Sequence, residues 1–142
     1  MFEVSFKNGD KEVKCVLGYF RGVHVTLCLS PEESPIAGYT VLDDGEIRDL
    51  WVDPQYRGNV DLVRLYEESL VGGVRNGVIN PNSGYLYSTV HVDNVTAQKA
   101  RTKKQLGWQE DIVTSENGEK WKRHYITINE LANLKVKDEI KH

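Results

Sequence analysis

Apolar and polar residues alternate along most of the first 52 residues, with the period of two expected of half-buried β-strands. Residues 22–29 show the alternation most clearly, with valine or leucine at every second position. Asn8-Gly9 lies between two alternating runs and predicts a tight hairpin turn, because such a turn needs positive φ angles. The first part of the chain therefore predicts a β-meander of four or five antiparallel strands, over residues 2–7, 11–19, 22–29, 36–42 and 46–52.

The pattern changes to helical spacing after residue 58. Asn59 suits the N-cap of a helix, and the carboxylate of Asp61 is favoured by the helix dipole in the first turn. Asn76-Gly77 predicts the end of this helix. Apolar residues that recur three or four positions apart predict its buried face, and they are Leu62, Val63, Tyr66, Leu70 and Val74.

The remaining pattern predicts a strand over Tyr85–Val92, followed by a second helix that Asp93 or Asn94 caps and that runs to about Leu106. A final hairpin follows, and a polar helix that starts at Thr127 or Asn129 ends the chain. This order of elements predicts a mixed α/β (α+β) fold, in which helices flank a mixed, largely antiparallel sheet.

Composition narrows the range of functions. A chain of 142 residues is the size of one domain, and its formal net charge of −3 argues against nucleic-acid binding. Two cysteines, Cys15 and Cys28, make no disulfide framework and no metal-binding spacing, so we expect reduced thiols in a cytoplasmic protein. No apolar run approaches the length of a membrane span, and the N-terminus has no apolar segment of the secretory kind.

Residues 46–58 and 94–108 carry two local motifs, a strand that leads into an Arg-Gly turn and a helix that ends in Leu-Gly-Trp, and both resemble motifs of the GNAT superfamily of N-acetyltransferases. Residues 46–58, EIRDLWVDPQYRG, resemble the family's acyl-CoA-binding segment, which has an acidic and apolar strand, a Val-Asp-Pro exit and an Arg-Gly turn that opens a helix. Residues 94–108, NVTAQKARTKKQLGW, resemble the second motif, in which an asparagine precedes a helix that ends in Leu-Gly-aromatic. The resemblance implies a single GNAT-like domain: an N-terminal meander (1–45), an acyl-CoA-binding core (46–113), and a final strand with a C-terminal helix (114–142).

The resemblance implies an acyl-CoA-dependent N-acyltransferase with acetyl-CoA as cofactor and an amine, on a small molecule or a protein, as acceptor. Direct attack by the amine needs a held thioester, a deprotonated amine and a polarised carbonyl. Backbone groups of the 50–52 strand would align the acyl arm, and the following turn would hold the pyrophosphate at a helix N-terminus. The residues that the resemblance assigns to the cofactor are Leu50, Trp51, Val52, Arg57, Gly58, Asn59, Val60, Asp61, Leu62 and Asn94.

Two residues are candidates for proton transfer. Glu46 begins the strand that leads into the turn, where some members of the family place a general base. Strand alternation puts Glu46 on the same face as Arg48, so an ion pair is the alternative interpretation. His91, near the end of the Tyr85–Val92 strand, could assist proton transfer as a neutral imidazole, and its alternative is a structural role.

The chain also differs from the family pattern. Val60 and Leu62 stand where the family has glycine or alanine, which let the backbone approach a pyrophosphate. Lys103 stands where active members often carry a tyrosine that protonates the leaving thiolate. An alternative function therefore stays open: a catalytically inactive GNAT-like protein, binding or structural, that acts through contacts with a partner protein or with a second copy of the chain.

Overall fold

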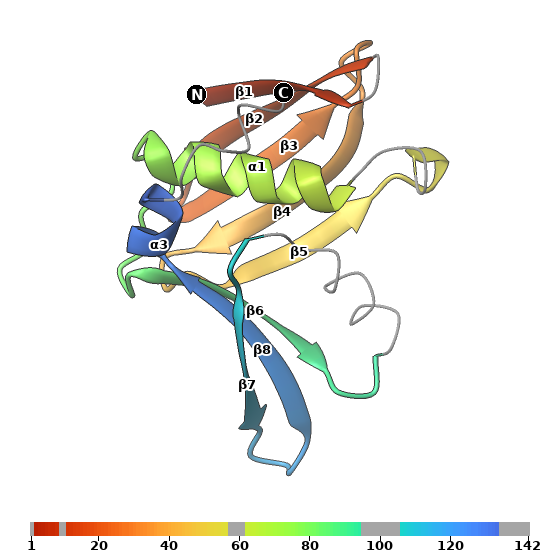
Figure 1. Cartoon of the computed structure of the whole chain (residues 1–142). Coiled ribbons are helices and arrows are strands. Elements are labelled where there is room, and N and C mark those ends of the chain that lie inside the picture. The colour runs from red at the N-terminus through yellow and green to blue at the C-terminus, as the bar shows by residue number, and fades with distance from the viewer. Residues whose placement is uncertain (1, 9–10, 57–61, 95–105, 134–142) are drawn as a thin grey trace.

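The computed structural model describes residues 2–8, 11–56, 62–94 and 106–133 (Figure 1). The first five strands form one antiparallel sheet in chain order, so the predicted meander is confirmed. Their bounds are Phe2–Asn8 for β1, Lys11–Phe20 for β2, Val23–Leu29 for β3, Pro35–Leu42 for β4 and Ile47–Val52 for β5.

Helix α1 (Leu62–Arg75) covers one face of this sheet (Figure 1). Its predicted apolar face is confirmed by the burial of Tyr66, Leu70 and Val74, while the predicted N-cap lies outside the described residues. The helix packs on alternate residues of the strands, which form one hydrophobic core that includes Val13, Cys15, Leu17, Cys28, Tyr39 and Val41. The two cysteines are free and lie directly opposite each other in the β2–β3 register.

Three further strands form a second antiparallel sheet in the order β6-β8-β7. Their bounds are Tyr85–His91 for β6, Gln109–Thr114 for β7 and Lys120–Thr127 for β8. Helix α3 (Ile128–Ala132) follows β8 directly, and Thr127, one of the two predicted starts, is its N-cap in a capping box with Glu130. A 3₁₀ turn (Pro54–Tyr56) follows β5, and the predicted helix between Asn94 and Leu106 falls mostly outside the described residues.

The two sheets meet at a single parallel bridge, Glu46 to Tyr87, among the described residues. The Tyr87 N–H donates to the Gly45 carbonyl at 3.0 Å. Beyond this joint β5 and β6 diverge, because β5 pairs with β4 and β6 pairs with β8 (Figure 1). The predicted mixed α+β class is confirmed, and the structure adds that the sheet is split in two where β5 begins.

A buried carboxylate holds the end of the second motif against α1. Glu67 is 5% exposed, and its Oε2 accepts hydrogen bonds from the Leu106 N–H at 2.9 Å and the Trp108 indole N–H at 2.8 Å. The Trp108 ring also stacks on Tyr66, with 6.3 Å between the ring centroids. Residues 106–108 are therefore fixed to the helix by charge-assisted hydrogen bonds as well as by packing.

In the described part of the chain, no helix combines the length and the apolarity that crossing a lipid bilayer requires.

We expect Gly45→Ala to weaken the joint between the sheets. Gly45 is buried at a φ of +95°, and a Cβ there would overlap the carbonyl oxygen of Tyr85. Gly118→Ala is a matched control, because Gly118 has a similar φ of +84° but nothing within 4 Å of an added Cβ. Urea unfolding should show a loss of about 1–2 kcal/mol for the control and about 1–3 kcal/mol more for Gly45→Ala. Equal losses in the two variants would contradict this account of the joint.

Glu67→Ala should lower the free energy of unfolding by about 2–3 kcal/mol, because it leaves two donors without their acceptor. The exposed Glu116, in the turn between β7 and β8, provides the control, and its change to alanine should cost less than about 0.5 kcal/mol. Chemical denaturation followed by tryptophan fluorescence measures both. A Glu67→Ala variant as stable as the control would show that the buried hydrogen bonds do not stabilise the fold.

Candidate functional site

β5 carries a β-bulge between Arg48 and Trp51. Thr40 of β4 is in register with Arg48 and Gly38 with Trp51, so Asp49 and Leu50 share the space opposite one β4 residue. Asp49 has a φ of +56°, and its Oδ2 accepts a hydrogen bond from the Thr40 hydroxyl at 3.0 Å. A bulge bends its strand and turns backbone groups out of the ladder. β5 is therefore bent on its way from the joint to the turn that precedes α1.

The outer edge of β5 faces the side on which β6 diverges. β5 is the last strand of its sheet, and beyond Glu46 no described strand pairs with this edge. Leu50 and Trp51 are 61% and 41% exposed, whereas Val52 is partly buried against the core. An open strand edge can hydrogen-bond an extended ligand. The three residues predicted to align an acyl arm thus lie on an edge strand that has this capacity.

Trp51 lies against the neighbouring strand β4. A Cβ at Gly38 would be 2.8 Å from the Trp51 Nε1, so only glycine leaves room for the indole. Trp51, which the resemblance assigns to the cofactor, thus packs on the face of the sheet and stays partly exposed.

Glu46 lies at the joint itself. Its Oε1 is 2.8 Å from the Arg48 Nη2, so the ion pair that strand alternation predicts as the alternative is present. The Glu46 side chain is 20% exposed, and Arg48 is the only described residue whose side chain pairs with its carboxylate. Glu46 can therefore accept a proton through Oε2 while Arg48 holds the other oxygen.

Asp44 and Tyr87 complete the joint, and sequence analysis missed both. The Asp44 carboxylate accepts from the Glu46 N–H at 2.9 Å and from the Tyr87 hydroxyl at 2.9 Å. Burial raises the pKa of Tyr87 to about 12, helped by the hydrogen bond to Asp44 and the negative charge of Glu46. Tyr87 therefore stays protonated at neutral pH. No local pattern could pair Asp44 with a residue 43 positions away.

His91 lies apart from the joint. It is four residues beyond Tyr87 on β6, which is about 13 Å along a strand. Its Nδ1 accepts from the Asp93 N–H at 3.2 Å, so a neutral ring carries its proton on Nε2, which is 3.8 Å from a Glu119 oxygen. The ring also packs edge-on against Trp121. The structure therefore does not bring the two predicted proton-transfer residues together.

The predicted phosphate-binding turn runs from Arg57 to Leu62. Residues 57–61, which include Arg57, Gly58, Asn59, Val60 and Asp61, lie outside the described residues, as does Lys103. Leu62 begins α1, and the Asn94 N–H donates to the His91 carbonyl at 2.9 Å. The assignment of this turn to a pyrophosphate stays a prediction.

Comparisons of sequence give no relative, since no protein-family model and no curated protein matches the chain. Solved structures do match it. The Vibrio cholerae spermidine N-acetyltransferase in complex with CoA and spermine is similar, with a TM-score of 0.61 and 15% identity over 80% of this chain and 70% of that one. A chimera based on the same enzyme has a TM-score of 0.62 and 15% identity, over 80% and 71% of the two chains. The described structure therefore has the fold of the GNAT N-acetyltransferases, which the two sequence motifs predicted.

Proposed function

We propose that the chain transfers an acyl group from acyl-CoA, with acetyl-CoA as the donor, to an amine. The observation that carries the proposal is the open, bulged edge of β5 where it leaves β6. The similar Vibrio cholerae enzyme is a spermidine N-acetyltransferase whose structure contains CoA and spermine, and its likeness in fold supports this choice of chemistry.

The residues of β5 fit the arm of a CoA thioester. This arm is an extended chain with two amides, and such a chain can exchange hydrogen bonds with the edge of a strand. Leu50, Trp51 and Val52 offer that edge, and the exposed side chains of Leu50 and Trp51 flank it. The N-terminal region of α1, with the turn before it, would hold the pyrophosphate through backbone N–H groups. Bound acetyl-CoA would supply the activated thioester carbonyl.

Glu46 supplies the base in this proposal. The amine nitrogen attacks the thioester carbon, an N–C bond forms, the C–S bond breaks, and the thiolate of CoA leaves. The proton that the amine loses passes to Oε2 of Glu46, directly or through a water molecule. Arg48 fixes the orientation of the carboxylate through Oε1. His91 has no role in this mechanism, because it lies about 13 Å from the joint along β6.

Acetyl-CoA should bind to the chain saturably, with a Kd below about 1 mM. Isothermal titration calorimetry with acetyl-CoA measures this, and acetyl phosphate, which lacks the pantetheine arm and the nucleotide, is the control that should give no comparable heat. If acetyl-CoA does not bind at millimolar concentration, the enzyme hypothesis is contradicted. The alternative of a catalytically inactive protein that binds a partner would then be favoured.

Glu46→Gln should lower kcat by about 10²- to 10⁴-fold while the Kd for acetyl-CoA stays unchanged, because glutamine keeps the shape of the side chain and loses the base. Release of the CoA thiol in the presence of a panel of primary amines measures the rate. Arg48→Gln is the control: it removes the ion pair and keeps the carboxylate, and we expect a change of less than about tenfold. Equal rates for Glu46→Gln and the unaltered chain would exclude Glu46 as the base.

A further inference from the structure

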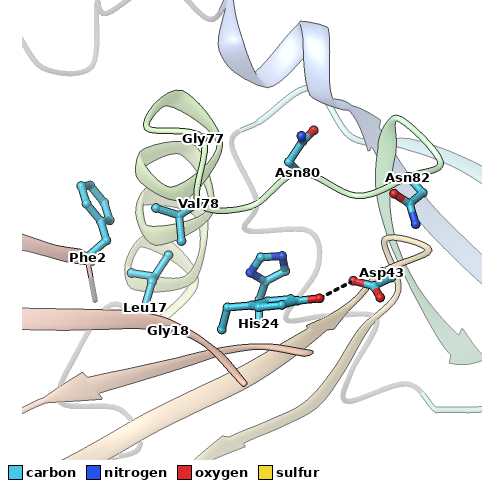
Figure 2. Close-up of a pocket in the computed structure, with 10 residues that line it drawn as sticks. Phe2, Leu17, Gly18, His24, Asp43, Gly77, Val78, Asn80 and Asn82 are labelled. Atoms are coloured by element: carbon cyan, nitrogen blue, oxygen red, sulfur yellow. Dashed lines mark hydrogen bonds between the residues drawn. The ribbon is translucent and has the colours of Figure 1, made fainter. Parts of the chain in front are cut away.

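A groove of about 700 Å³ lies on the α1 side of the molecule, between the ends of the first strands and the loop that joins α1 to β6 (Figure 2). Among the described residues, no residue of β5 lines the groove. The groove is therefore separate from the open strand edge to which we assign the acyl donor.

The two ends of the groove differ in chemistry. Phe2, Leu17 and Val78 form an apolar end, whereas Asp43 and Asn82 lie at the opposite end (Figure 2). His24 and Asn80 lie between these ends and add further polar groups. A ligand that fills the groove would carry an apolar body and a polar head.

The charge of the lining favours a cationic head. Asp43 contributes a carboxylate, and neither lysine nor arginine lines the part of the groove that the structure describes. Burial lowers the pKa of His24 against the opposing effect of Asp43, and the buried Nδ1 of His24 has no hydrogen-bond partner in the described structure. The imidazole is therefore neutral at neutral pH and does not offset the negative charge of Asp43.

Hydrogen bonds within the protein hold the polar end of the groove in position. The Asn82 N–H donates to the Asp43 carbonyl at 2.8 Å, which ties the α1–β6 loop to the β4–β5 turn. The Tyr19 hydroxyl donates to the Asp43 Oδ1 at 3.4 Å, and Oδ2 has no partner among the described residues. The Tyr19 ring lies 4.7 Å from the His24 ring, so an aromatic surface, which attracts cations, lies next to the carboxylate.

We propose that this groove binds a small organic cation, with its ammonium group at Asp43 and its apolar body against Phe2, Leu17 and Val78. The amide oxygens of Asn80 and Asn82 are further acceptors for the ammonium protons. The proposal does not rest on acyl transfer, because the groove and the β5 edge share no residue.

Three probes of one shape test the proposal on the unaltered chain at pH 7: benzylamine as its ammonium ion, neutral benzyl alcohol and benzoate. Titrations of the ¹⁵N-labelled protein should show saturable shifts at Tyr19, His24, Asn80 and Asn82 for benzylammonium. Benzyl alcohol should bind at least about tenfold more weakly, and benzoate should cause no saturable shift. Similar affinities for all three probes, no saturation, or shifts centred on Glu46 and Tyr87 would overturn the proposal.

Asp43→Asn should weaken benzylammonium binding at least about fivefold, because it removes the carboxylate and keeps the size of the side chain. Glu116→Gln removes one negative charge at the β7–β8 turn and should leave the affinity unchanged, which controls for net charge. Unchanged affinity in a folded Asp43→Asn variant would refute the assignment. If the Asp43→Asn variant does not fold, the order of the affinities of the three probes for the unaltered chain decides whether the proposal holds.

Discussion

The structure depends on the short parallel contact at which β5 begins. One bridge between Glu46 and Tyr87, supported by the hydrogen bond from the Tyr87 N–H to the Gly45 carbonyl, joins two sheets that otherwise pair within themselves. Since the contact is limited to this point, β5 and β6 diverge and β5 keeps an open edge. The carboxylates of Asp44 and Glu46 lie at the same point because the turn before β5 is short. The limited backbone contact between the two sheets therefore determines where the open edge lies and where Glu46, the base that we assign, lies.

Secondary-structure elements that are specified by residues close together in the sequence were predicted well. Alternation over residues 22–29 and the Asn8-Gly9 turn predict strands, because one face of each strand must be buried and a tight turn needs particular residues. The apolar face of α1 and the start of the last helix at Thr127, one of the two starts predicted, also depend on a few neighbouring residues. The GNAT fold itself was predicted from two motifs, although the similar solved structures share only 15–16% identity with this chain.

Features that depend on contacts between distant parts of the chain were not predicted. Glu67 lies outside the apolar face predicted for α1, yet it is buried, because residues 106–108 bring two donors to it. The same limit applies to the site: the Glu46–Arg48 pair follows from alternation within one strand, whereas Asp44 meets Tyr87 only through the meeting of two sheets. His91 shares a face with Tyr87, yet its partners come from the β7–β8 hairpin and the end of β6.

The bulge in β5 also bears on how the molecule behaves in solution. A flat, open edge strand is a template on which a second chain can add a long run of hydrogen bonds, and this leads to edge-to-edge association. The left-handed conformation of Asp49 interrupts the regular repeat of backbone donors and acceptors after only a few residues. A short extended ligand needs no more than such a run, whereas a β-strand of another molecule needs a longer one. The bulge in this open edge therefore limits what can bind to it.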